Sequence, residues 1–279
     1  MQPTDARTDD GLFGSGSVTW RVHVEPVLWV AGIRALLLQS LHPRVMRGTA
    51  QNSALADPAR AWQRFQRTAE FVGIRTFGSS AEVERAARRV RRLHARLRGY
   101  DPDTGTDFAL DDVENLLWVH CGEIDSYVDV AYRCGIVNRA DADRYVAESR
   151  RAAEVVGIPI DLAPGSRADL AAYFARMRPR IYACGEARES ALRMLNPPLP
   201  RDLIGLRLAA PSVVALAFAL LPRWARRLYG APGLPTTDLA ATASVRLLHV
   251  ALTAWYRPTA TAGPATRPPD RRTHAGLDR

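Results

Sequence analysis

The stretch that decides the fold is "ENLLWVHCGEIDSY", residues 114–127, where a histidine stands in the middle of a strongly apolar run. On a helical wheel of about 100° per residue, Leu117, Ile124 and Tyr127 fall on the same side as His120. The pattern predicts a central helix that buries this histidine. A buried imidazole has to spend its nitrogens on hydrogen bonds or on a metal.

A second histidine has the same setting in "RRVRRLHARLRG", residues 88–99. His94 falls on the apolar side of the helix predicted here, flanked by Arg91 and Arg98, while most of the other arginines point to solvent. Consecutive helices that each carry a buried histidine could place the two imidazoles across one cavity. Taken singly, each histidine has a simpler explanation as a core residue whose hydrogen bonds are satisfied.

The period of the apolar residues is helical almost everywhere, and no alternating run with hairpin turns occurs. We expect an all-α fold, one multi-helix domain over residues 18–257, with disordered ends at 1–17 and 258–279 because these are rich in Gly, Pro, Thr and Arg. The predicted helices are 26–41, 43–50, 58–72, 80–98, 111–134, 139–156, 167–177, 184–195, 203–220, 222–229 and 236–256.

Two capping boxes and one glycine predict where the two helices that carry His94 and His120 begin and end. Ser79 with Glu82 predicts the start of the helix that carries His94, and Gly99 its end. Asp111 with Glu114 predicts the start of the helix that carries His120 by the same reasoning.

Composition limits the chemistry of this chain of 279 residues, which is 47% hydrophobic and has a net charge of +9. No lysine occurs, which excludes lysine nucleophiles and Schiff bases. Cys121, Cys134 and Cys184 form no C-x-x-C pair and are odd in number, so we expect free thiols and a cytoplasmic protein. The first residues lack the apolar core of a signal peptide.

One segment is apolar enough to suggest a membrane. Residues 203–222 carry a single charge, at Arg207, and contain Pro211. The uninterrupted apolar run is shorter than the roughly 20 residues of a membrane span, so we expect a buried or surface-docked helix. The basic and aromatic sequel "RWARRLYG" makes 203–229 a candidate for peripheral membrane contact.

Other catalytic patterns are missing. The chain has no Glu-x-x-His pair, no H-E-x-x-H helix, no G-x-S-x-G elbow and no phosphate-binding glycine loop. Haem is then the cofactor best suited to helices that bear histidine and arginine, because imidazole binds iron and arginine pairs with propionates. Of the other histidines, His42 ends a helix, His249 is expected to be structural, and His23 and His274 look peripheral.

The segments "AGIRALLLQSLHPRVMRGTAQNS", "RRLHARLRG" and "LLWVHCGEIDSYVDVAYRCG" resemble the bacterial branch of the haem oxygenase family typified by the latex-clearing rubber oxygenase and by the fungal oxygenase MpaB. The resemblance runs from about residue 18 to about residue 257. It implies a globin-like helical core around haem b and the O2-dependent cleavage of isoprenoid double bonds.

The resemblance also implies roles for individual residues. The proximal iron ligand falls on His120. The rubber enzyme carries an Arg-x-x-Lys-Thr motif whose lysine approaches the iron from the other side. The matching stretch here is "RRLHA", so Arg91 keeps its place while His94 replaces the lysine and Ala95 the threonine.

Together these points predict a haem b oxygenase that acts with O2 on a small apolar substrate of the isoprenoid or lipid class. His120 and His94 are the predicted iron ligands, and His94 with Arg91 forms the catalytic pair. Arg91, Arg98 and His42 are further haem-binding candidates, and Glu123 or Asp125, about one turn beyond His120, could orient groups around that histidine. An alternative is a non-catalytic haem sensor with two histidine ligands. A nucleic-acid-binding module is disfavoured, because the outward arginines fit a solvated face and no helix-turn-helix stands out.

Overall fold

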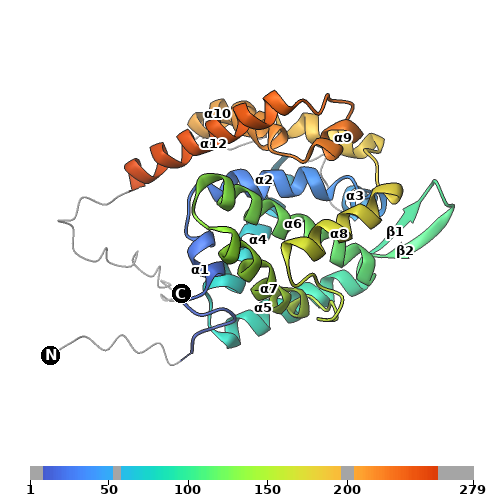
Figure 1. Cartoon of the computed structure of the whole chain (residues 1–279). Coiled ribbons are helices and arrows are strands. Elements are labelled where there is room, and N and C mark those ends of the chain that lie inside the picture. The colour runs from blue at the N-terminus through green and yellow to red at the C-terminus, as the bar shows by residue number, and fades with distance from the viewer. Residues whose placement is uncertain (1–8, 53–57, 196–203, 257–279) are drawn as a thin grey trace, which may run out of the picture.

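The computed structural model describes residues 9–52, 58–195 and 204–256, and within them the chain forms twelve α-helices and one small sheet (Figure 1). The prediction of an all-α fold is confirmed. The helices are α1 (Val18–His23), α2 (Leu28–Gln39), α3 (Pro43–Asn52), α4 (Pro58–Phe77), α5 (Ser80–Arg96), α6 (Val113–Cys134), α7 (Arg139–Val155), α8 (Arg167–Met177), α9 (Gly185–Met194), α10 (Ile204–Ala219), α11 (Arg223–Leu228) and α12 (Pro235–Tyr256).

Helices α2 and α6 pack along each other and form the centre of the core. Trp118 is fully buried and donates its indole N–H to the Gln39 carbonyl at 2.8 Å. In return, the Gln39 amide donates to the Val119 carbonyl at 2.8 Å. A Cβ atom at Gly122 would lie 2.9 Å from Cγ of Gln39, so the close approach of the two helices depends on glycine at this position.

The other helices cover this pair from two sides. In Figure 1, α9, α10 and α12 lie above α2, while α1, α5 and α7 lie below. Helix α10 packs on α2, and α12 packs on both α6 and α10. None of the described helices combines the length and the hydrophobicity that crossing a membrane requires.

A buried arginine links three of these elements. Arg34 of α2 is 2% exposed, and its Nε donates to the Leu220 carbonyl, just after α10, at 3.0 Å. Its other nitrogens reach α6: Nη1 donates to Ser126 Oγ at 2.7 Å, and Nη2 lies 2.9 Å from Asp125 and 3.6 Å from Asp129. The guanidinium therefore ties α2, α6 and the end of α10 together.

The predicted cap of α5 is confirmed and that of α6 is wrong. Ser79 caps α5, because its hydroxyl accepts the Glu82 N–H while the Glu82 carboxylate accepts the Ser79 N–H at 2.9 Å. Helix α6 is preceded by Asp112, whose side chain makes no capping hydrogen bond. The box predicted at Asp111 and Glu114 therefore does not form, and Glu114 instead contacts Arg180 at 2.8 Å.

A hairpin of strands β1 (Arg98–Asp101) and β2 (Thr106–Ala109) connects α5 to α6, contrary to the prediction that no sheet forms. Gly99 lies in β1 and does not end α5 as predicted. A Cβ atom there would lie 2.4 Å from Cζ of Phe108 across the hairpin, so glycine is required by the ring packed on it. Asp101 pairs with buried Arg47 of α3. Strands of four residues are too short to show the alternation that predicts a sheet.

The N-terminal segment adds contacts that the periodicity did not indicate. Helix α1 was not predicted. Before it, Asp9 accepts the Ser80 N–H at 2.7 Å and Phe13 is buried. The assignment of residues 18–257 as one domain with disordered ends stays a prediction, and residues 1–8 and 257–279 lie outside the described residues.

Replacing the buried arginine tests its structural role. We expect Arg34→Met to lower the free energy of unfolding by on the order of 3 kcal/mol, because Asp125 loses its cation where water solvates it poorly, whereas Asp129 keeps its pair with Arg133 at 2.8 Å. Arg88→Met is the matched control, since the pair of Arg88 with Glu84 is about half exposed on both sides and should contribute at most about 0.5 kcal/mol. Urea unfolding followed by circular dichroism measures both variants, and equal losses would contradict the role given to Arg34.

Candidate functional site

His120 lies on the buried face of α6, as its apolar neighbours predict. The side chain is 4% exposed. Burial lowers its pKa from 6.5 to about 4, an effect that Glu123 opposes and Arg75 reinforces. The imidazole is therefore neutral at neutral pH, which is the form that binds a metal ion.

A buried ion pair stands beside this histidine. Arg75 of α4 and Glu123 of α6 contact each other, and their side chains are 5% and 14% exposed. Burial alone would lower the pKa of Arg75 and raise that of Glu123, but pairing outweighs it, so the two pKa values move apart. Both groups stay charged, and the pair connects α4 to α6.

His23 of α1 completes a second side of this arrangement. Its Nε2 lies 3.0 Å from the hydroxyl of Tyr145, and its ring stacks on Tyr127 with centroids 4.7 Å apart. Burial lowers its pKa to about 4, and the Arg75–Glu123 pair acts on it as it acts on His120. The description of His23 as peripheral is wrong, because α1 carries it inward.

These six residues form one group, which we call the buried polar cluster. They come from four helices, so the cluster exists only in the folded chain. Burial raises the pKa of both tyrosines, which keeps the two hydroxyls protonated. The members are His23, Arg75, His120, Glu123, Tyr127 and Tyr145.

His94 lies on α5 in a half-buried position. Its Nδ1 is buried without a hydrogen-bond partner, an arrangement that costs free energy unless a ligand satisfies the nitrogen. Burial lowers its pKa, with Arg64 acting in the same direction and Asp111 against it. His94 and His120 are thus influenced by different charged residues, and their predicted roles as iron ligands stay predictions.

Arg64 was not among the predicted site residues. It lies on α4 with an exposed side chain that donates to Thr49 at 3.4 Å, yet burial lowers its pKa. Leu116 and Tyr127, which share a face of α6 with His120, are half-buried.

The predicted arginines have partners elsewhere. Arg91 donates to the Val155 carbonyl at 2.7 Å and to Glu84 at 3.1 Å, so it attaches α5 to the end of α7. Arg98 is exposed and donates to two carbonyls at the end of α5, at 2.8 and 2.9 Å. Neither is among the residues that act on the pKa of His94 or His120.

Two further predicted residues, His42 and Asp125, lie away from His120. His42 packs on Trp118 just before α3, and its Nε2 lies 3.4 Å from Glu114. Asp125 belongs to the Arg34 contacts on another face of α6. Of the two acids suggested as orienting groups, the structure brings only Glu123 to His120.

The chain also matches a known protein family. Residues 20–256 match the model described as "ER-bound oxygenase mpaB/B'/Rubber oxygenase, catalytic domain". The chain belongs to this family. Comparisons with curated proteins and with solved structures gave no match. The resemblance to this oxygenase family is confirmed, whereas the bacterial branch stays a prediction. The matched residues 20–256 include all six residues of the buried polar cluster.

The cluster predicts how stability depends on pH. The pKa of His23 is 6.5 in the unfolded chain and about 4 in the folded protein. Between these two pH values the unfolded chain binds a proton that the folded chain does not. The free energy of unfolding is therefore unaffected by His23 above pH 6.5 and falls as the pH drops from 6.5 towards 4. The total loss is on the order of 3 kcal/mol. His120 acts in the same direction.

Urea unfolding of the cofactor-free protein at a series of pH values measures this slope. His23→Gln should reduce the slope between pH 6.5 and 4 by about one proton. Tyr145→Phe is the control, because it removes the hydroxyl beside His23 but leaves the imidazole buried and should keep the slope. An unchanged slope in His23→Gln would show that His23 is not held neutral by the fold.

Proposed function

We propose that this member of the family is a haem b oxygenase that uses O2 on an apolar substrate, with His120 as the iron ligand. The observation that carries the proposal is the burial of His120 as a neutral imidazole on a face of α6 whose neighbours are partly accessible. Family membership supplies the oxygenase activity, and the residues supply the case for haem.

The residues present fit a haem group. Haem b, when bound, supplies an iron that binds and activates O2. His120 would hold that iron, and Glu123, one turn away, would keep the surroundings of the imidazole anionic. The unsatisfied Nδ1 of His94 marks a second position where an imidazole lacks a partner. Arg64, which acts on the pKa of His94, is the arginine that could pair with a propionate beside that histidine, whereas Arg91 and Arg98 donate to backbone carbonyls.

The ion pair has a separate task in this proposal. Arg75 is anchored by Glu123 and also lies close enough to His23 and His120 to act on both pKa values. Its charge lowers both pKa values, and at His23 this effect is larger than the opposite effect of Glu123. At His120 the effect of Glu123 is the larger one, so burial is what keeps His120 neutral and able to bind a metal. Half-buried apolar side chains of α4, among them Phe65, Ala69 and Val72, would exclude water from an apolar substrate.

His120→Gly tests the ligand assignment. The purified protein reconstituted with haem should show a Soret band, and the variant should lose it and release haem, because the ligand that holds the iron is gone. Added imidazole should restore the band in the variant by filling the vacated position, which separates loss of a ligand from misfolding. His249→Gln is the control, since His249 of α12 faces Glu25 and not the buried polar cluster. A variant that keeps its spectrum would overturn the assignment.

His94→Ala tests the second histidine and separates the two candidate functions. If His94 also ligates the iron, the variant should shift the absorption spectrum from a six-coordinate to a five-coordinate form. An unchanged spectrum would restrict His94 to the lining of the site. The unsatisfied nitrogen is also compatible with a stable two-histidine sensor, which would consume no oxygen, so oxygen uptake with a panel of terpenoids and polyisoprenoids distinguishes it from the oxygenase.

A further inference from the structure

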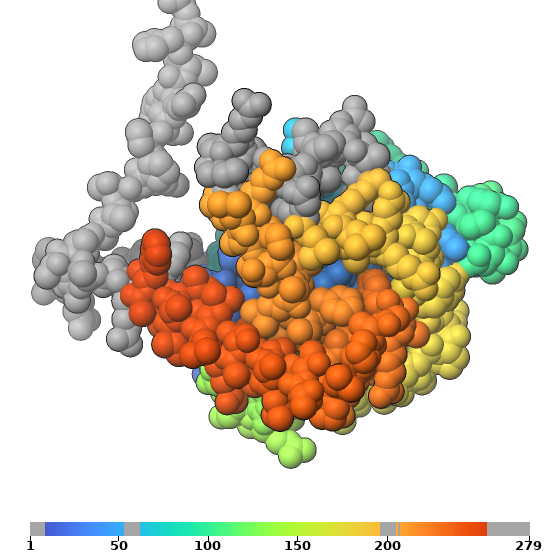
Figure 2. Space-filling view, turned by 90° about the horizontal axis from the view of Figure 1, so that it is seen from above, coloured from blue at the N-terminus to red at the C-terminus, as the bar shows by residue number. Residues whose placement is uncertain are grey.

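The outer surface of α10 and α12 is apolar and exposed. Figure 2 shows these two helices extending side by side over one face of the molecule. Leu208 of α10 is 76% exposed, and Leu247 and Trp255 of α12 are 71% and 88% exposed. Exposed side chains of this size, gathered on one face, are typical of a binding surface.

The exposed side of α12 carries almost no charge. On a wheel of about 100° per residue, its exposed residues fall on one continuous arc, with Arg246 at the edge as the only charged member. A helix of a monomer normally turns such an arc inward and its charged side to water. The larger members of the arc and the small residues between them include Leu239, Ala243, Leu247, Val250, Ala254 and Trp255.

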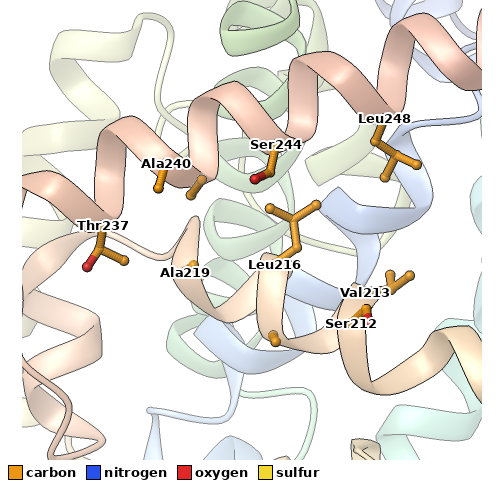
Figure 3. A pocket seen from close by; sticks show the side chains of 10 residues that line it. Ser212, Val213, Leu216, Ala219, Thr237, Ala240, Ser244 and Leu248 are labelled. Carbon is orange, nitrogen blue, oxygen red and sulfur yellow. The ribbon is translucent and has the colours of Figure 1, made fainter.

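A groove separates the two helices within the same surface. It has a volume of about 510 Å³ and lies between Val213 and Leu216 of α10 and Ala240 and Leu248 of α12. Figure 3 shows the side chains of the two helices facing each other across it, with Ser212 and Ser244 as polar members. We call the exposed arc of α12, the exposed side of α10 and this groove the α10–α12 face.

The charge around this face is positive. Residues 204–256 contain five arginines and a single acid, Asp238. That acid is already neutralised, because it accepts hydrogen bonds from Arg223 at 2.5 Å and from Arg226 at 2.6 Å. Arg207 of α10 and Arg246 of α12 have exposed side chains, and so does Arg227 of α11, while Nε of Arg246 donates to the Arg133 carbonyl at 2.5 Å.

We propose that the α10–α12 face docks on the surface of an anionic phospholipid bilayer, with α12 lying in the plane of the interface. The apolar arc would enter the acyl region while the bordering arginines pair with phosphate groups. Trp255, at the end of α12, has the ring type that prefers this interface. The proposal does not depend on haem or on His120.

Charge decides between a bilayer and a second copy of the chain. Two copies placed face to face would bring like-charged arginine borders together without free acids to match them. An anionic surface is complementary to the same border. The surface also differs from the predicted contact region 203–229, because most of its apolar side chains belong to α12, which lies outside that region, while α11 buries Ala225 and Arg226.

Vesicle sedimentation with the full chain tests the proposal. The wild type should bind vesicles of phosphatidylcholine mixed with phosphatidylglycerol, and bind more weakly to pure phosphatidylcholine or at high salt, because the arginine attraction is screened. The double variant Leu247→Glu with Val250→Glu should lower the affinity by about tenfold or more, because two apolar anchors become charged. Leu93→Glu on α5 is the control, since Leu93 is exposed but distant from this face, and it should bind as the wild type does.

Tryptophan fluorescence adds an independent readout. Binding should shift the emission of the wild type to shorter wavelength, and Trp255→Phe should remove most of that shift. Absence of vesicle binding by the wild type, or equal binding by the double variant, would overturn the proposal. If sedimentation velocity shows a dimer that the double variant abolishes and vesicles do not bind, the face is an interface between copies and the proposal is wrong.

Discussion

The burial of the Arg34 guanidinium is the constraint on which the rest of the structure depends. A cation that is 2% exposed needs partners on every side, and here they come from the end of α10 and from Ser126, Asp125 and Asp129 of α6. Because these partners belong to segments far apart in the sequence, satisfying one charge sets the position of α10 on the central pair of helices. The same two helices, α2 and α6, come closest at Gly122, where a Cβ atom would lie 2.9 Å from Cγ of Gln39.

Helix α6 consequently has two polar sides with different tasks. The side that faces Arg34 is structural, and its acids are already paired. The other side carries His120 and Glu123, and there Arg75 forms an ion pair with Glu123. A helix built in this way can hold a reactive imidazole in a dry setting while its structural charges are satisfied elsewhere.

Local patterns predicted most of the helices and the central histidine, because both depend on the spacing of residues within one segment. The box of Ser79 and Glu82 and the apolar surroundings of His120 are of this kind. What the sequence could not indicate was pairing between segments. Arg75 stands in an apolar run and His23 in a short helix. Their partners lie on other helices, so the contacts that they make exist only after α1, α4 and α6 pack together. Arg91 shows the converse, since its wheel position beside His94 did not reveal the Val155 carbonyl that it binds.

The hairpin between α5 and α6 has a mechanical consequence. Gln51 of α3 bonds both backbone groups of Tyr100, each at 2.8 Å, and Asn52 donates to the Arg98 carbonyl at 2.7 Å. The connection between the two histidine-bearing helices is therefore held at its base, and Asp103 of its turn contacts Arg47 at 2.8 Å. A Cβ atom at Gly105, in the same turn, would meet no other atom within 4 Å. Chain added at that turn would leave the spacing of the two helices intact, so the tip is a natural place to attach a spectroscopic label or an affinity tag.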